Sequence, residues 1–413
     1  MRGLYWVETL GCPKNQVDSD KLAGTLEADG MSPARSPAEA DVVVVNTCAF
    51  IEAARQESVD TVLALADAKS GGARLVVTGC MAERYGEELA AALPEADLVA
   101  GFGVPVTLGA RRDAARLDLL NLPRPAASAP WAYVKVAEGC DRKCGFCAIP
   151  SFRGPQRSRP VGAILDEVDA LGAREIVLVA QDLASYGRDV EGMGAGSIVA
   201  LVEAVAARVE RTRLLYLYPS DLTDALVKAV GATGVPYFDL SLQHASKPLL
   251  RRMRRWGDGE RFLRRIASIR ERLPDAAFRT NFIVGYPGET EADHDELLRF
   301  VAAAQVDWCG FFAYSREDGT YAAGLEGAVP AALVRERLAE VGEMQDRITA
   351  QRRQALVGHT LEVLVDRPGV GRSHREAPEI DGIVRIPETL STGHTVKVVV
   401  TGAEGPDLEA RAL

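Results

Sequence analysis

The first hundred residues alternate short runs of β-branched residues with stretches of helical periodicity. The run 42–45 is entirely apolar, which is typical of a strand that is buried on both faces of a parallel sheet. The β-α-β-α-β order predicts a parallel α/β sheet. The expected strands are 5–10, 42–47 and 75–78, and the expected helices are 17–28, 51–68 and 82–93.

A proline-rich stretch at 122–130 predicts a domain boundary, and strand and helix patterns alternate again beyond it. Helical stretches such as 164–171 and 260–273 separate the strands. Six such units are too few for a closed eight-stranded barrel, so the pattern predicts an open (βα)6 partial barrel. The six expected strands are 133–137, 176–181, 214–218, 237–242, 278–284 and 309–314.

From about residue 358 the chain consists of short β segments between glycines and prolines, at 360–365, 382–386 and 395–400. This pattern predicts a small antiparallel β-barrel, which a helix at 331–356 joins to the central region. The predicted fold class is therefore α/β, with domains at 1–121, 122–357 and 358–413.

The composition of the 413-residue chain, 47% hydrophobic and 26% charged, is that of a globular protein. The apolar runs fall far short of the ~20 residues of a membrane span, and the N-terminus has no signal-type apolar core. We therefore expect a cytoplasmic protein without a membrane partner. The net charge of −10 argues against non-specific binding of nucleic acid, which requires a basic surface.

Three of the seven cysteines, Cys140, Cys144 and Cys147, lie within eight residues in a loop that leaves a predicted strand. In a reducing compartment, clustered cysteines indicate metal binding or catalysis more than disulfides. Three thiolates can hold three irons of a 4Fe–4S cube and leave the fourth iron open. The alternative is a zinc knuckle or three unrelated thiols.

A second set, Cys12, Cys48 and Cys80, follows the three predicted strands of the N-terminal region, one cysteine after each strand. The carboxyl ends of adjacent parallel strands converge on one crevice, so these thiols are expected to meet and to leave one metal position open. Gly11 and Gly79 let the backbone turn tightly beside them. The alternative is three buried core cysteines.

With Phe146 before its last cysteine, the loop triad resembles that of the radical S-adenosylmethionine enzymes, whose open iron chelates S-adenosylmethionine. Over nearly its whole length the chain resembles the methylthiotransferase family of that superfamily. The motifs that carry the resemblance are TLGCPKNQVDS at 9–19, NTC at 46–48, GC at 79–80, EGC at 138–140, SRP at 158–160, QD at 181–182, SLQHAS at 241–246 and TNFIVGYPGET at 280–290.

The resemblance implies two 4Fe–4S clusters, one on each cysteine triad, and a C-terminal TRAM domain for substrate recognition. It implies that S-adenosylmethionine is both radical source and methyl donor, that sulfur is delivered from the Cys12, Cys48 and Cys80 cluster, and that a protein such as flavodoxin or ferredoxin supplies electrons. The residues expected to contact S-adenosylmethionine are Phe146, Gln181, Ser241, Gln243 and Ile283.

Branches of the family differ in substrate, which is either adenosine in transfer RNA or an aspartate of protein twelve of the small ribosomal subunit. The strings PSFRG at 150–154 and EAPEIDG at 376–382 resemble the ribosomal-protein branch. Residues 358–413 carry six Lys and Arg against nine Asp and Glu, so we expect Glu376, Glu379 and Asp381 to attract a basic ribosomal protein and to repel RNA.

The expected activity is thus methylthiolation of an aspartate β-carbon in that ribosomal protein, with nucleic acid an unlikely substrate. The alternatives are a transfer-RNA adenosine methylthiotransferase and a non-catalytic iron–sulfur electron carrier. A carrier has no need of the large central domain, which argues against it.

Three other features have simpler interpretations. The run RRMRR at 251–255 is interpreted as the solvated end of a helix, with a contact for acidic substrate groups as the alternative. Cys309 is expected to be a core thiol. His244 is expected to make structural hydrogen bonds and not to bind metal.

Overall fold

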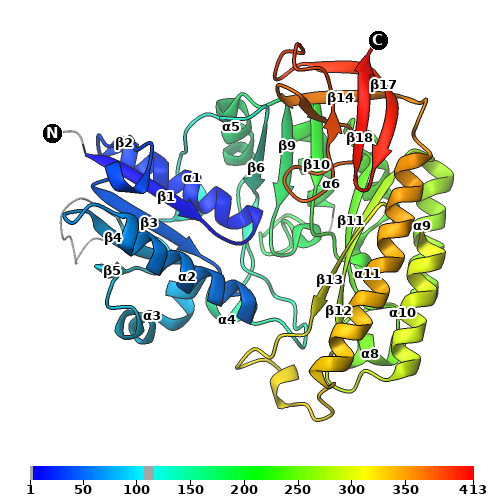
Figure 1. Cartoon of the computed structure of the whole chain (residues 1–413), viewed down its shortest axis with the longest axis horizontal. Coiled ribbons are helices and arrows are strands. Elements are labelled where there is room, and N and C mark those ends of the chain that lie inside the picture. Colours follow the sequence, from blue (N-terminus) through cyan, green and yellow to red (C-terminus); the bar gives the residue numbers. More distant parts are fainter. Residues whose placement is uncertain (1–2, 107–115, 195) are drawn as a thin grey trace.

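The computed structural model describes residues 3–106, 116–194 and 196–413 of the chain. An N-terminal α/β sheet, a central partial barrel and a C-terminal β-barrel follow one another in sequence, coloured from blue to red in Figure 1.

Within residues 3–106, five parallel strands form one sheet in the order β2-β1-β3-β4-β5. The three predicted strands and three predicted helices are confirmed, and the short edge strands β2 and β5 were not predicted. The helix α1 begins at Pro13, four residues before the predicted start, because proline fits the first turn of a helix, where its missing N–H is not needed. The elements are β1 (Leu4–Thr9), α1 (Pro13–Ala28), β2 (Ser32–Pro33), β3 (Val42–Thr47), α2 (Glu52–Ala68), β4 (Arg74–Gly79), α3 (Cys80–Ala92) and β5 (Leu98–Val99).

The central part of the described chain contains six parallel strands, in the order β6-β9-β10 and β11-β12-β13. An isolated parallel bridge between Leu217 and Leu240 joins the two halves, so the predicted open (βα)6 partial barrel is confirmed. The strands are β6 (Trp131–Lys135), β9 (Glu175–Val179), β10 (Arg211–Leu214), β11 (Tyr237–Gln243), β12 (Ala277–Val284) and β13 (Trp308–Ala313).

Helices between these strands cover the outer face of the partial barrel, where their apolar faces form the largest core cluster with the strands. A short antiparallel pair, β7 (Ala137–Glu138) with β8 (Arg157–Ser158), flanks the cysteine loop. The helices are α4 (Ile149–Arg153), α5 (Val161–Leu171), α6 (Ser197–Ala206), α7 (Asp224–Gly231), α8 (Lys247–Arg252), α9 (Gly259–Arg272), α10 (Glu291–Ala304) and α11 (Ala331–Gln354).

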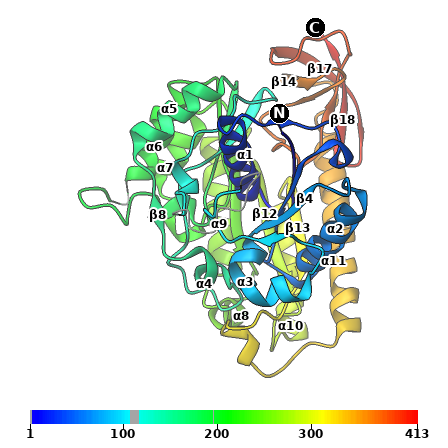
Figure 2. The same cartoon turned by 90° about the vertical axis from the view of Figure 1, so that its left-hand side faces the viewer.

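The N-terminal domain reaches both edge strands of the open barrel (Figures 1 and 2). Its helix α1 packs against the edge strand β6. At the other edge, Arg55 of α2 and Arg84 of α3 both pair with Glu317, which follows β13, at N–O distances of 2.5 and 2.7 Å. The side chain of Glu317 is only 2% exposed, so the two domains form a buried ionic junction there.

Residues 358–413 form the closed barrel that was predicted, with strand order β14-β15-β16-β18-β17. Its core consists mainly of aliphatic side chains. The prediction of an antiparallel barrel needs one correction, because β16 and β18 run parallel. The strands are β14 (Thr360–Arg367), β15 (Val370–Arg372), β16 (Val384–Arg385), β17 (Thr395–Glu404) and β18 (Asp407–Ala412).

The expectation that Glu376, Glu379 and Asp381 form an acidic docking segment is wrong. Glu376 is fully buried, pairs with Arg353 and accepts hydrogen bonds from the Ser373 amide and hydroxyl at 2.7 and 2.6 Å. Asp381 accepts from the Tyr237 hydroxyl at 2.6 Å and from the Ala377 amide at 2.9 Å. Glu379 is exposed, but its carboxylate accepts from the Tyr133 hydroxyl. Glu376 and Asp381 fasten the C-terminal segment to the central barrel, so of the three acids only Glu379 presents its charge at the surface.

The same segment meets the beginning of the central strands. Ala377 lies in a core cluster with Tyr133, Val177 and Tyr237. Glu175, the first residue of β9, is fully buried and pairs with Arg213 at 2.7 Å and with Arg372 of the C-terminal domain at 3.1 Å. The small domain is therefore attached at the end of the barrel opposite to the strands' carboxyl ends.

Across the described residues, no helix combines the length and the apolar character that a bilayer crossing demands.

Candidate active site

The N-terminal cysteines lie at one edge of the sheet because the strands end in register. Thr9 of β1 is opposite Asn46 of β3, and Thr47 is opposite Gly79 of β4. Cys48 and Cys80 follow their strands directly, and Cys12 lies three residues after the end of β1. The strands thus end together, as the parallel sheet predicts, and the joint binding of one group by the three thiols stays a prediction.

Two glycines make this edge compact. Gly11 and Gly79 have φ angles of 96° and 93°, which side chains rarely adopt. A Cβ on Gly11 would lie 2.9 Å from Cys48 Sγ, and a Cβ on Gly79 would lie 2.2 Å from Asn46 Oδ1. The close approach of the loops at this edge therefore depends on glycine at both positions.

Asn15, in the first turn of α1, connects all three loops. Its fully buried amide donates to the carbonyls of Leu10 and Thr47, at 2.8 and 3.1 Å, and its Oδ1 lies 3.5 Å from Cys80 Sγ. This side chain holds the three strand ends at fixed separations. Asn15 belongs to the motif at 9–19, but the residue type alone does not indicate this role.

The second triad lies in the loop that follows β6 and β7. The loop is closed by hydrogen bonds from the Cys140 amide to the Gly154 carbonyl at 3.1 Å and from the Cys147 amide to the Cys144 carbonyl at 3.2 Å. The Arg142 amide points at Cys140 Sγ at 3.4 Å. Arg142 itself is held by ion pairs to Asp182 and Asp221.

Arg255 also belongs to this site, which corrects the interpretation of residues 251–255 as a solvated helix end. Its side chain is 9% exposed, donates to Cys144 Sγ at 3.3 Å and to the Ser241 carbonyl, and stacks on the Tyr218 ring at 3.9 Å. Arg251, Arg252 and Arg254 are exposed, as expected. The last arginine of the run therefore faces the cysteine loop and not the solvent.

A buried charge network extends from Cys80 of the first triad to the strand that precedes the second triad. Arg153, at the end of α4, donates to Cys80 Sγ at 3.0 Å, to Asn15 Oδ1 at 2.7 Å and to Asp18 Oδ2 at 2.9 Å. It also pairs at 3.0 Å with Glu138, which lies two residues before Cys140. Lys135 completes the network through ion pairs with Asp18 and Glu138. One guanidinium thus contacts a cysteine of the first triad and the strand that leads to the second.

These surroundings shift the acid–base properties of the site. Burial raises the pKa of Cys80, and it raises the pKa of Cys48 to about 12, of Cys140 to about 11 and of Cys147 to about 12. Burial also acts on Cys12, but the positive charges of Lys14 and Arg153 outweigh it and lower the pKa of that thiol. Metal binding needs thiolates, so iron would displace protons from most of these cysteines.

The residues expected to contact S-adenosylmethionine lie around the mouth of the central barrel. Gln181 follows β9, donates to Glu138 at 2.7 Å and carries a buried Oε1 that has no hydrogen-bond partner among the described residues. Ser241 and Gln243 end β11, Ile283 lies near the end of β12, and Phe146 lies in the cysteine loop; Phe146 and Ile283 pack against the core. Their contacts to the cofactor stay a prediction.

Cys309 and His244 behave as simpler groups. Cys309 packs against the core, and His244 is fully buried and accepts a hydrogen bond from the Ser246 amide at 3.0 Å. Burial lowers the pKa of His244 to about 3, so it is neutral at pH 7. The structural hydrogen bond of His244 is thus confirmed, and Cys309 is a partly buried thiol at the edge of the core.

The donor set fits iron–sulfur clusters better than single metal ions. In the part of the chain that the structure describes, no group of three or more His, Cys, Asp or Glu side chains could hold one metal ion. A cube binds each thiolate through a different iron, with inorganic sulfide between them, and it is tuned by hydrogen bonds to its sulfurs. Both triads have such donors, namely Arg153 at Cys80 and Arg255 at Cys144.

Models of known protein families match the three parts of the chain. An uncharacterized protein family, UPF0004, matches residues 4–101, the radical SAM superfamily matches 134–301 and the TRAM domain matches 357–413. A Nocardioides protein named ribosomal protein uS12 methylthiotransferase RimO is 43% identical, over 98% of this chain and 96% of the relative. A protein of the same name from Cutibacterium acnes is 41% identical over the same shares.

The chain belongs to the family of ribosomal protein uS12 methylthiotransferases. The resemblance found in the sequence motifs is thereby confirmed, and so is the radical S-adenosylmethionine class of the central domain.

Solved structures of lower sequence identity support the fold. The radical S-adenosylmethionine methyltransferase TsrM from Kitasatospora setae, with cobalamin and a 4Fe–4S cluster bound, superposes with a TM-score of 0.51. The sequence identity is 13%, and the match covers 95% of this chain and 84% of TsrM. An α/β domain beside a radical-enzyme barrel is thus an arrangement found outside the methylthiotransferase family.

Proposed function

We propose that this enzyme methylthiolates the β-carbon of an aspartate in ribosomal protein uS12, with S-adenosylmethionine as radical source and methyl donor. The observation that carries the proposal is that the guanidinium of Arg153 contacts both Cys80 of the N-terminal triad and Glu138, which lies two residues before Cys140 of the central triad. Relatives that share almost the full length of the chain and are named for this reaction support the choice of substrate.

In this proposal Cys140, Cys144 and Cys147 hold one 4Fe–4S cluster, and Cys12, Cys48 and Cys80 hold the other. When bound, such groups supply the one-electron and sulfur chemistry that amino-acid side chains lack. We keep the domain boundaries 1–121, 122–357 and 358–413 as part of the proposal, with the first domain for sulfur delivery, the second for radical chemistry and the third for recognition.

The chain's own residues position these groups and compensate their charge. Arg255 and the Arg142 amide donate to sulfurs of the central triad, and Arg153 donates to Cys80 of the other. Charge-assisted donors of this kind are stronger than neutral ones and stabilise thiolates in a buried site. Asn15 keeps the separation of the N-terminal loops fixed.

S-adenosylmethionine would occupy the barrel mouth, beside Phe146, Gln181, Ser241, Gln243 and Ile283. The unpartnered Oε1 of Gln181 supports this placement, because a buried acceptor without a donor is unfavourable and a ligand can satisfy it. A protein reductant of the flavodoxin or ferredoxin class and a cytoplasmic location complete the proposal.

The test is a reaction of the anaerobically reconstituted enzyme with S-adenosylmethionine and dithionite. In parallel samples it receives uS12 or bulk transfer RNA, and mass spectrometry detects the added methylthio group. Modification of one aspartate in uS12, with transfer RNA unchanged, is expected. Modification of transfer-RNA adenosine alone would favour the other branch, and failure to form deoxyadenosine would leave only an electron carrier.

A further inference from the structure

The charge of the chain is distributed unevenly, and one short segment has the opposite sign to the whole. Residues 247–272, which include α8 and α9, carry ten Lys and Arg against three Asp and Glu. The segment therefore has a net charge of +7 in a chain whose net charge is −10. Such a local excess produces a positive field at the surface.

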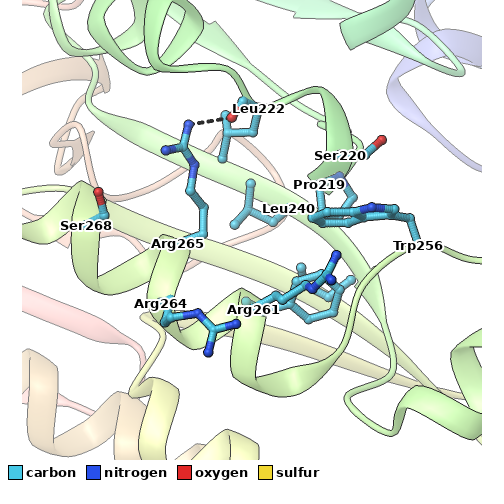
Figure 3. A pocket seen from close by; sticks show the side chains of 11 residues that line it. Pro219, Ser220, Leu222, Leu240, Trp256, Arg261, Arg264, Arg265 and Ser268 are labelled. Atoms are coloured by element: carbon cyan, nitrogen blue, oxygen red, sulfur yellow. Dashed lines mark hydrogen bonds between the residues drawn. The ribbon is translucent and has the colours of Figure 1, made fainter.

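This basic segment lines a pocket of about 360 Å³ on the outer side of the barrel (Figure 3). The floor is apolar and includes Leu222, Leu240 and Phe262. Trp256, 42% exposed, stands at one side with Arg261 beside its ring, and Arg264 and Arg265 project from α9 at the other side (Figure 3). A large exposed aromatic side chain beside arginines is the composition found at the centre of protein interfaces.

Two sets of contacts connect the pocket to the central cysteine triad. Trp256 directly follows Arg255, whose guanidinium contacts Cys144 Sγ at 3.3 Å. The Trp256 amide also donates to the Tyr218 hydroxyl at 3.4 Å, and both Arg255 and Arg142 stack on the Tyr218 ring, at 3.9 and 3.8 Å. Beside Trp256, the short helical turn Pro219–Asp221 places Asp221 in an ion pair with Arg142 (Figure 3).

We propose that this surface, formed by Trp256, Arg261, Arg264 and Arg265, is the docking site of an acidic one-electron donor protein. The proposal rests on the proposed function, which requires one electron at the central triad for each radical generated. The donor is oxidised by one electron, and the group held by Cys140, Cys144 and Cys147 is reduced by one. A donor docked here would be separated from a cysteine ligand by little more than Arg255 and Tyr218.

Charge and position both favour this occupant. Three arginines on the face have local carboxylate partners, Asp258, Glu260 and Asp224, and Arg251 and Arg254 of the same basic segment are exposed as well. An acidic protein is attracted by the surplus, whereas the rest of this acidic chain repels it. The pocket is lined by Leu240, Leu242 and Phe262, which belong to the core between the helices and the strands, and by no cysteine of either triad, so a partner docked there leaves the triads free for substrate.

The test compares two variants of the reconstituted full-length enzyme with the wild type. Arg261→Glu/Arg264→Glu reverses two side chains that are 53% and 61% exposed. Arg335→Glu/Arg347→Glu is the matched control, since it reverses two exposed arginines on α11, which is separated from α9 by α10. The probe is an acidic flavodoxin carrying FMN, and the dissociation constant is measured by calorimetry at low salt.

The first variant should bind flavodoxin about tenfold more weakly, and the control should bind as the wild type does. Added salt should also weaken flavodoxin binding by the wild type, because salt screens the attraction between opposite charges. Optical bleaching of the clusters by reduced flavodoxin should slow in the first variant, while bleaching by dithionite should not change.

Equal flavodoxin binding by the two variants would overturn the proposal. So would a loss of binding to a ribosomal RNA fragment in the first variant with flavodoxin binding intact, which would make the face an RNA contact. Because these measurements need no uS12, a failed methylthiolation assay with dithionite would count against the proposed function and not against the docking site.

Discussion

Arg153 provides the sharpest test of the junction between the two triads. Its side chain is 8% exposed and contacts Cys80, Asn15, Asp18 and Glu138. The substitution Arg153→Met keeps most of the volume but removes the charge and all four contacts. Asp18 and Glu138 would then share one cation, Lys135, and the buried network would carry a net negative charge.

The size of the effect follows from the burial of the partners. Removing one member of a buried ion pair costs about 3–5 kcal/mol, because the partner stays buried without compensation. Asp18→Asn should also destabilise, by leaving surplus positive charge. The double variant restores neutrality, because Lys135 then pairs with Glu138. Its loss of unfolding free energy should therefore be smaller than the sum of the losses in the two single variants, by about 0.5–3 kcal/mol.

Urea unfolding of the reduced apoprotein, followed by tryptophan fluorescence, measures all three free energies. Arg264→Met is the matched control, because it removes an exposed arginine–glutamate pair and should cost at most about 1 kcal/mol. The view that Arg153 stabilises the junction would be refuted if Arg153→Met lost less than about 1 kcal/mol of unfolding free energy. It would also be refuted if the loss in the double variant equalled the sum of the losses in the two single variants.

The remaining predictions concern the clusters and the acid stability of the domains. Anaerobic reconstitution should give about eight irons per chain, and replacing either cysteine triad by alanine should leave about four; an unchanged iron content would contradict the ligand assignment. Gly79→Ala should lower only the iron of the N-terminal triad, because its Cβ would collide with Asn46, whereas Gly162→Ala, whose Cβ meets open space in the described structure, should keep both clusters. Burial acts to raise the pKa of Glu138, Glu175 and Glu376, but their basic partners outweigh it and lower the pKa of each to about 2, below the usual 4.5. The unfolded chain therefore binds more protons in this range, and circular dichroism should show stability falling as the pH drops from about 4.5 towards 2; Glu376→Gln should flatten that fall.

Most of the fold could be predicted from the sequence because apolar runs mark strands that are buried on both faces. The run 42–47 is β3 without any shift. The third central strand was placed at 214–218 and lies at Arg211–Leu214, since its sequence RTRL looks like a surface segment. Its arginines are buried only because Glu175 and the C-terminal segment lie opposite them, and no local pattern reveals such partners.

The residues of the site that could be predicted are the cysteines, whose role follows from residue type and spacing. The roles that depend on a partner from another part of the fold could not be predicted. The cysteine spacings identified both triads. In α1, by contrast, Lys14, Asn15, Asp18 and Lys21 are polar and yet buried, because they contact Tyr216, Arg153, Lys135 and Glu167 of the central domain. A polar stripe is normally interpreted as a solvated face. The same reasoning made Glu376 and Asp381 look like a docking surface, although each has a buried partner in the central domain.

The most direct test of the central claim is mass spectrometry of uS12 from cells that lack the gene and are complemented with variants. The wild-type chain should restore the methylthio group on one aspartate of uS12. The Cys12, Cys48 and Cys80 triple alanine variant should not restore it, although the purified variant should still form deoxyadenosine with dithionite. If that variant restores the modification, or if the wild-type chain leaves uS12 unmodified and transfer RNA acquires the methylthio group, the account is contradicted.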